Sequence, residues 1–242
     1  MKNEEYLHRM NNGLVSQRLS HIVNFVDFSK VKTILDIGSW HLDQSIEFMN
    51  IFPNANVYAF EPNPDSANLC RRRVEGMGHE NSSRIFVNEL ALTNKKGTIK
   101  FYPLDASKTN STNHGMSSTL RLKDGMDGSW HNDKWVQKEI EVEATTLDSW
   151  CSENNIVPDL LWVDVQGAEY NLYEGGKNTI KNHVMIILTE VGIVPYYEGH
   201  TVKPDIDKLL KNELGMEEVE DSFEMADSYE ANTIYIKREK IS

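Results

Sequence analysis

Two acidic residues, Asp36 and Glu61, each follow a short apolar segment and lie 25 positions apart in the chain. This spacing accommodates a buried strand, a crossover helix and a second, parallel strand. In such a unit a small residue lets backbone amides approach a ligand, and the acid after the second strand accepts hydrogen bonds from ribose hydroxyls. The pattern therefore predicts a nucleoside-binding site, with Asp36, Gly38 and Ser39 in its first turn and Glu61, Pro62 and Asn63 at its second strand end.

A third acid, Asp164, lies in the apolar strand predicted over Leu160–Val165. A carboxylate at the end of a buried strand must be solvated, paired or ligand-bound. Asp164 therefore either caps the helix that follows or contacts a ligand and orients an acceptor hydroxyl. Glu190, after the apolar run 184–189, is its expected neighbour across the sheet. With Glu169 these two acids would suit a divalent cation, but the spacing does not require a metal and none is predicted.

Two histidines are candidates for a general base, because an imidazole titrates in the range needed to remove a hydroxyl proton. His114 lies in a segment rich in Ser and Thr, and His200 follows the sequence Tyr-Tyr-Glu-Gly. The alternative for each is an ordinary surface or hydrogen-bonding role. Aromatic side chains of the same two segments either wall an acceptor pocket or pack in the interior: Trp130, Trp135, Tyr196 and Tyr197.

The elements that position these residues follow from periodicity. Helical spacing of apolar residues predicts an amphipathic helix within residues 4–28, which covers a sheet edge, a dimer surface or a substrate. Pro64–Arg73 is predicted as a helix capped by Asn63. The polar segment 105–135 lacks periodicity, which is typical of a functional loop such as a lid or of disorder. Further strands are predicted over residues 84–87, 98–102, 139–144, 216–220 and 232–237.

Strands that alternate with helices favour a mostly parallel sheet covered on both faces, and the last two strands would add an antiparallel edge. The fold class is therefore α/β and Rossmann-like. The 242 residues suit one large domain, residues 31–242, preceded by a helical extension over residues 1–30.

Composition limits the partners. The formal charge of −12 argues against nucleic acid or an anionic membrane as a partner, because phosphate binding needs clustered Lys and Arg. Cys70 and Cys151 lie in separate segments without metal-ligand spacing, which indicates reduced thiols. We find no secretory segment and no run of about 20 apolar residues, so a cytoplasmic protein is expected.

Several motifs resemble, in order and spacing, those of the FkbM-family methyltransferases, a branch of the class I S-adenosylmethionine-dependent enzymes. The resemblance spans about residues 31–215. Its motifs are DIGSWHLDQS, YAFEPNP, ELALTNKKGTIKFY, TTLDSW, DLLWVDVQGAE and TEVGIVPYYEGH.

The resemblance implies a seven-stranded sheet of order 3-2-1-4-5-7-6, with strand 7 antiparallel and S-adenosylmethionine across the ends of strands 1 and 2. Asp36 and Gly38 would border its methionine moiety, and Glu61 would hold the ribose hydroxyls. Asn88 and Glu89 would lie near the adenine. The chain departs from the family pattern at four positions. Trp40 stands where the family usually has a small residue or Asn, and Leu42 where it has Gly. Trp162 replaces the usual Lys, and Gln166 the usual Glu.

The predicted reaction is O-methylation of a hydroxyl on a small molecule or glycan, since a sulfonium methyl needs mainly alignment and a proton acceptor. One alternative is a nicotinamide-dependent oxidoreductase, although the first turn lacks G-x-G-x-x-G. Another is a non-catalytic nucleoside-binding or scaffold protein of the same fold. The oligomeric state is open, with a homo-oligomer as one option.

Overall fold

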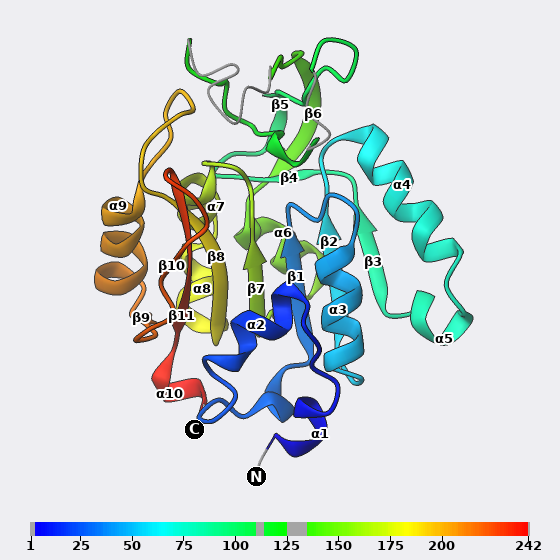
Figure 1. Cartoon of the computed structure of the whole chain (residues 1–242), viewed down its shortest axis with the longest axis vertical. Coiled ribbons are helices and arrows are strands. Elements are labelled where there is room, and N and C mark those ends of the chain that lie inside the picture. The colour runs from blue at the N-terminus through cyan, green and yellow to red at the C-terminus, as the bar shows by residue number, and fades with distance from the viewer. Residues whose placement is uncertain (1–2, 110–113, 125–134, 242) are drawn as a thin grey trace.

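The computed structural model describes residues 3–109, 114–124 and 135–241. Its centre is a sheet of eight strands (Figure 1). These are β1 (Thr33–Ile37), β2 (Asn56–Phe60), β3 (Ile85–Asn88), β7 (Leu160–Val163), β8 (Ile186–Gly192), β9 (Glu217–Glu218), β10 (Glu224–Met225) and β11 (Glu230–Ile236).

The strands are arranged in the order β10-β11-β8-β7-β1-β2-β3, and β9 also pairs with β11. Pairing is parallel from β8 to β3 and antiparallel between β11 and β8. The predicted Rossmann-like sheet with an antiparallel strand near the C-terminus is thus confirmed. Two short strands, β9 and β10, lie beside β11 where the resemblance implied one, so the sheet has eight strands and not seven.

Helices cover both faces of the sheet, which explains why the central strands are apolar throughout; all four residues of β7 are buried. One face carries α2 (Leu14–Ser20), α3 (Asp43–Ile51) and α4 (Pro64–Glu75). The other face carries α6 (Leu147–Asn154), α7 (Glu169–Gly175), α8 (Lys177–Asn182), α9 (Lys203–Asp207) and the π-helical turn η3 (Lys208–Glu213).

Capping residues set the starts of two predicted helices. The Asn63 side chain accepts a hydrogen bond from the amide of Asp65 and Pro64 occupies the first turn of α4. The Thr146 side chain likewise accepts a hydrogen bond from the amide of Ser149 at the start of α6. Neither these helices nor any other within the described residues is long and apolar enough to cross a membrane.

The N-terminal segment forms two helices, α1 (Glu4–Leu7) and α2, and not the single helix predicted. Asn11, Asn12 and Gly13 separate them, and such residues favour turns. The carboxylate of Glu47 in α3 then accepts hydrogen bonds from the amides of Val15 and Ser16. This contact fixes the start of α2 against α3, and α2 lies in front of the central strands in Figure 1.

A second, three-stranded sheet lies above the carboxyl ends of the main sheet (Figure 1). It consists of β4 (Ala91–Leu92), β5 (Gly97–Phe101) and β6 (Ile140–Thr145), in the order β4-β6-β5. The sequence predicted strands at 98–102 and 139–144 but not that they form a sheet of their own. Their alternation of exposed and buried residues shows that only one face is covered.

Candidate functional site

A pocket opens at the carboxyl ends of β1, β2 and β7, beneath the second sheet. Of the residues predicted for the site, Gly38, Glu61, Pro62 and Asp164 line this pocket. The remainder of its described lining is Ile37, Trp40, Phe60, Ser66, Leu90, Ala91, Leu92, Phe101, Gly115, Ser117, Thr119, Val165 and Ala168.

The turn between β1 and α3 has an unusual backbone. Gly38 has a φ of 90°, and a Cβ added there would lie 1.8 Å from the carbonyl oxygen of Asp164. Glycine is therefore required here because the protein's own backbone comes close. The sequence pattern predicted a small residue for a different reason, the approach of a ligand. Trp40 (φ 44°) and Leu42 (φ 68°) also adopt left-handed conformations, which cost a non-glycine residue about 1–3 kcal/mol each. Although Trp40 and Leu42 replace the small residues usual in the family, the turn thus keeps a backbone conformation typical of glycine.

Asp36 is fully buried, and its Oδ2 accepts a hydrogen bond from the hydroxyl of Ser45 in α3. Its Oδ1 has no partner among the described residues. Burial raises the pKa of Asp36 to about 7, and the hydrogen bond from Ser45 offsets this only in part. Asp36 and the buried Ser39 lie next to Gly38 but are not among the lining residues.

Glu61 lies at the end of β2, 6% exposed. Its two carboxylate oxygens accept hydrogen bonds from backbone amides, Oε2 from Trp40 at 3.0 Å and Oε1 from Asn63 at 2.8 Å. Burial raises the pKa of Glu61 to about 7, although these two hydrogen bonds act to lower it. Each oxygen keeps a further lone pair, so the carboxylate has the capacity to accept from a pair of ligand hydroxyls.

The residues predicted near an adenine lie beside the pocket and not in its described lining. Asn88 donates hydrogen bonds to the carbonyls of Ala59 and Phe86. Glu89 forms an ion pair with Arg71 at 2.6 Å. Leu90 to Leu92, which follow them, contribute the apolar wall.

Asp164 and Glu190 form a half-buried carboxyl pair bridged by Gln166. The Gln166 amide nitrogen donates to Asp164 Oδ1 at 2.7 Å and to Glu190 Oε2 at 3.0 Å. Gln166 therefore holds the two carboxyl groups close to each other. Burial raises the pKa of Asp164, and burial together with the Asp164 charge raises that of Glu190 well above its usual value. Gln166, at a position where the family usually has Glu, thus supplies a hydrogen-bond donor between two acids.

Two buried acids, Glu169 and Glu230, lie near this pair. Glu169 accepts hydrogen bonds from the amides of Val165 and Gly167, and burial raises its pKa to about 7. Burial, followed by the charge of Asp164, raises the pKa of Glu230 to about 8. Across the described ranges no three His, Cys, Asp or Glu side chains are placed to hold a metal ion.

His200 is packed between backbone and rings. It is 8% exposed, and Cβ atoms built on Gly167 and Gly192 would fall within 3.1 Å of its imidazole. Burial, and then the charge of Lys123, lowers its pKa to about 4, so the ring is neutral. It is not among the described lining of the pocket. His114 begins the short helix η2 (His114–Met116) beside Gly115, and its side chain lies outside the described residues.

The aromatic residues proposed for an acceptor pocket form a small core of their own. Tyr197, Tyr196 and Trp135 are at most 4% exposed and pack with Leu104, Met116 and Leu122. These side chains therefore pack in the interior, as the alternative interpretation predicted. Trp130 lies outside the described residues.

Sequence reasoning missed the upper wall of the pocket. Phe101 comes from the second sheet, and Gly115, Ser117 and Thr119 come from the segment 105–135. The polar composition of that segment was the only available signal, and it indicated a functional loop without indicating which residues reach the pocket.

A sheet of this order, with a pocket over the adjacent tips of β1 and β2, defines a Rossmann-like fold of the methyltransferase type. Residues 37–217 match the methyltransferase FkbM domain, and the chain belongs to that family. A related protein is the 2-O-methyltransferase NoeI of Sinorhizobium fredii, 34% identical over 169 residues. This match includes 69% of the chain and 65% of NoeI, so the chain spans less than two thirds of that relative.

Two solved structures share the fold. Methyltransferase FkbM from Methylobacillus flagellatus has a TM-score of 0.55 at 10% identity, over 97% of this chain and 58% of that one. The Sp1610 protein of Streptococcus pneumoniae, in complex with S-adenosyl-L-methionine, has a TM-score of 0.50 at 14% identity, over 91% and 72%. At these identities the comparison supports the architecture alone.

Proposed function

We propose that the protein is an S-adenosylmethionine-dependent O-methyltransferase that acts on a hydroxyl of a small molecule or glycan. The observation that supports this most is the pocket bounded by Glu61 at the tip of β2 and Asp164 at the tip of β7. Family membership and a relative described as a 2-O-methyltransferase favour the same reaction.

The residues of the pocket suit this cofactor. Glu61 would accept from the ribose hydroxyls, and the apolar side chains of Phe60, Leu90 and Leu92 would pack against the adenine. Gly38 and Asp164 would border the methionine end. When bound, the cofactor supplies a methyl group on a positively charged sulfur, and the sulfur–carbon bond breaks as the oxygen–carbon bond forms.

The pocket is narrow, with a free volume of about 50 Å³. Small-molecule sites usually measure about 300–1,000 Å³, so part of the wall must move to admit a nucleoside. Gly115, Ser117 and Thr119 belong to the segment 105–135 and lie over the pocket. We infer that this described part of the segment acts as a lid. Equal protease cleavage between residues 105 and 135 with and without ligand would contradict it.

The Asp164–Glu190 pair is the proposed proton acceptor. Its raised pKa values follow from burial, and a base with a pKa nearer to neutrality accepts a hydroxyl proton more readily. Whichever carboxyl of the pair is ionised would accept the proton. His200 has a lowered pKa and lies outside the pocket lining, so it is the weaker candidate.

Calorimetric titration with S-adenosylhomocysteine tests the cofactor. We expect binding to the wild-type protein and at least tenfold weaker binding to Glu61→Ala, because two charge-assisted hydrogen bonds are lost, each of about 1.5–3 kcal/mol. Glu153→Ala is the matched control, since Glu153 pairs with Lys96 at the surface on α6. Absence of binding to the wild type, or equal binding to Glu61→Ala, would refute the proposal.

The alternatives predict different ligands. A nicotinamide-dependent oxidoreductase would show a thermal shift with NAD and none with S-adenosylhomocysteine. A non-catalytic protein would bind the latter and transfer no labelled methyl group to any acceptor in a metabolite or glycan extract.

A further inference from the structure

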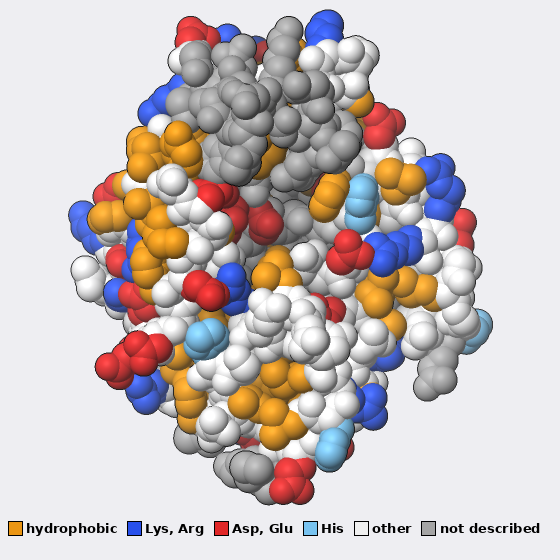
Figure 2. Space-filling view, viewed as in Figure 1, with side chains coloured by type: hydrophobic (Ala, Val, Ile, Leu, Met, Phe, Trp, Pro, Cys, Tyr) orange, Lys and Arg blue, Asp and Glu red, His pale blue; other side chains and the backbone are white. Residues whose placement is uncertain are grey.

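A second cavity, of about 300 Å³, lies on the sheet face that α2 covers. Asp164 lines both this cavity and the pocket above, so the two spaces adjoin at this residue. Figure 2 shows acidic side chains inside a hollow in the middle of this face. Its lining includes Arg18, Trp162, Asp164, Glu190, Ala226 and Asn232.

The cavity is apolar at one end and rich in oxygen at the other. Residues two apart in an extended segment share a face. Trp162 of β7 and Leu188 of β8 therefore share the cavity side with Asp164, which follows β7, and with Glu190 of β8. Asn232 is paired with Glu190 in the register of β11 and β8, which places it beside the two acids. This gradient suits a ligand with an apolar face and several hydroxyl groups.

Arg18 of α2 forms the opposite wall and has an unused donor. The residue is 7% exposed, and its Nε has no partner among the described residues. Its Nη1 pairs with Glu224 of β10, a side chain that is 66% exposed. A buried donor without a partner is unfavourable, so a ligand oxygen would satisfy it. Because Glu224 already balances the positive charge of the Arg18 guanidinium, we expect a neutral ligand and not an anion.

From these contacts we propose that this cavity binds the methyl acceptor and that the acceptor is an uncharged, polyhydroxylated ring, such as one sugar residue. The inference rests on the proposed function. The ring would lie against Trp162, accept a hydrogen bond from Arg18 Nε and direct a hydroxyl at the Asp164–Glu190 pair. Asp164 then adjoins both the reacting oxygen and the cofactor pocket. The volume lies at the lower end of small-molecule sites, which favours a single ring.

Blocking the cavity at its rim tests the location. Ala226 lies at an exposed position on the wall, so Ala226→Trp fills the space without replacing a core residue. The matched control is Val157→Trp, since Val157 is 54% exposed and precedes β7 at the opposite end of the sheet. The probes are methyl glycosides of common hexoses and deoxyhexoses, with binding followed by saturation-transfer NMR and turnover by labelled methyl transfer.

Replacing Arg18 tests the chemistry. Arg18→Met keeps most of the apolar stem and removes the donors, and we expect KM for the glycoside to rise roughly tenfold to hundredfold. Glu224→Gln removes the ion pair and leaves Nε in place, so its KM should stay within about twofold of wild type. S-adenosylhomocysteine binding should be unchanged in both variants, because neither residue lines the cofactor pocket.

The outcomes separate the two proposals. Loss of glycoside binding in Ala226→Trp, with binding kept in Val157→Trp, supports a glycoside site in the cavity even if the wild-type protein fails to bind S-adenosylhomocysteine. That failure would refute the proposed function, and with it the role of the glycoside as methyl acceptor. Unchanged glycoside binding in both Ala226→Trp and Arg18→Met would overturn the inference. So would a wild-type protein that neither binds nor methylates any glycoside of the panel.

Discussion

At the residue scale, the ionisation of Glu61 should control cofactor affinity. Burial raises its pKa to about 7, and ribose hydroxyls donate to the carboxylate and not to the acid. The affinity for S-adenosylhomocysteine should therefore rise roughly tenfold between pH 6 and pH 8, because the ionised fraction rises by about that factor. Calorimetry across this range is the measurement.

The control for Glu61 is Glu61→Gln, which should bind more weakly with a flatter pH profile. This variant also separates Glu61 from Asp36, whose pKa is likewise raised to about 7 by burial. An affinity that falls as pH rises in the wild type would contradict the assignment of Glu61 to the ribose.

Gln166 provides a second test at this scale. Its amide donates to Asp164 and Glu190, and Gln166→Glu would replace that donor with a third carboxyl. At pH 8 we expect a loss of about 1–3 kcal/mol in the free energy of unfolding. At pH 5 the loss should be smaller, because protonated carboxyls can donate to one another. Urea unfolding at both pH values measures this; an equal loss at the two would indicate a packing defect instead.

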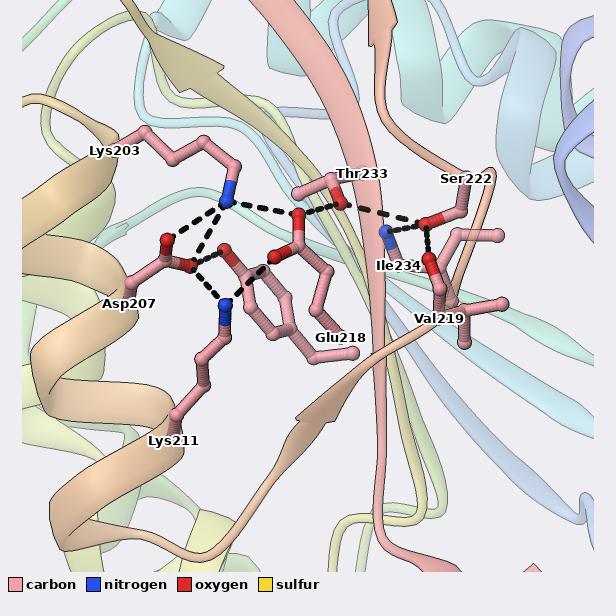
Figure 3. Close-up of polar contacts among 9 residues, drawn as sticks. Lys203, Asp207, Lys211, Glu218, Val219, Ser222, Thr233 and Ile234 are labelled. Atoms are coloured by element: carbon pink, nitrogen blue, oxygen red, sulfur yellow. Dashed lines mark hydrogen bonds and ion pairs between the residues drawn. The ribbon is translucent and has the colours of Figure 1, made fainter.

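At the scale of elements, a network of charges joins α9, η3 and β9 to β11 (Figure 3). Lys203 donates to Asp207 and Glu218 at 2.8 Å each, and Lys211 reaches the same two acids. Although burial acts in the opposite direction, hydrogen bonds from Lys203 hold the pKa values of Asp207 and Glu218 below their usual range. The network therefore stabilises the fold above about pH 4–4.5 and loses this effect as pH falls.

Lys203→Met should test this network. The Lys203 side chain is 15% exposed. Its removal leaves Lys211 as the remaining cation for two partly buried carboxylates, so we expect a loss of about 1–3 kcal/mol at pH 7. Lys177→Met is the control, since Lys177 and Glu213 form a surface pair at 3.3 Å and should contribute about 0–1 kcal/mol. Equal urea midpoints for both variants would show that the network contributes no more than a surface pair.

The sequence predicted the elements whose patterns are long and missed those formed by few residues. β1, β2, β7 and β8 are apolar runs, and their acids meet because the carboxyl ends of parallel strands share one sheet edge. β4 and β10 have two residues each, too few for any periodicity. The burial of His200 depends on Gly167 and Gly192, which lie in two other segments, so no local pattern could indicate it.

At the scale of the whole molecule, the buried acids give the stability an unusual dependence on pH. Six carboxyl groups have pKa values raised mainly by burial: Asp36, Glu61, Asp164, Glu169, Glu190 and Glu230. An acid with a raised pKa in the folded state binds more protons folded than unfolded between its two pKa values. For Asp36, Glu61, Glu169 and Glu230 the stabilisation is therefore complete below about pH 4 and is lost as pH rises through about 7 to 8. Asp164 and Glu190 act in the same direction.

We therefore expect the free energy of unfolding, from urea titrations, to fall between pH 5 and pH 8, and the midpoint of thermal unfolding with it. Asp36→Asn should flatten this slope, because the amide remains neutral while its oxygen still accepts from Ser45. Since the Lys203 network acts in the opposite direction and only at lower pH, the two effects separate along the pH axis. A stability that stays level or increases from pH 5 to pH 8 would show that the acids at the strand tips are ionised in the free protein, which would contradict the raised pKa values of Asp164 and Glu190.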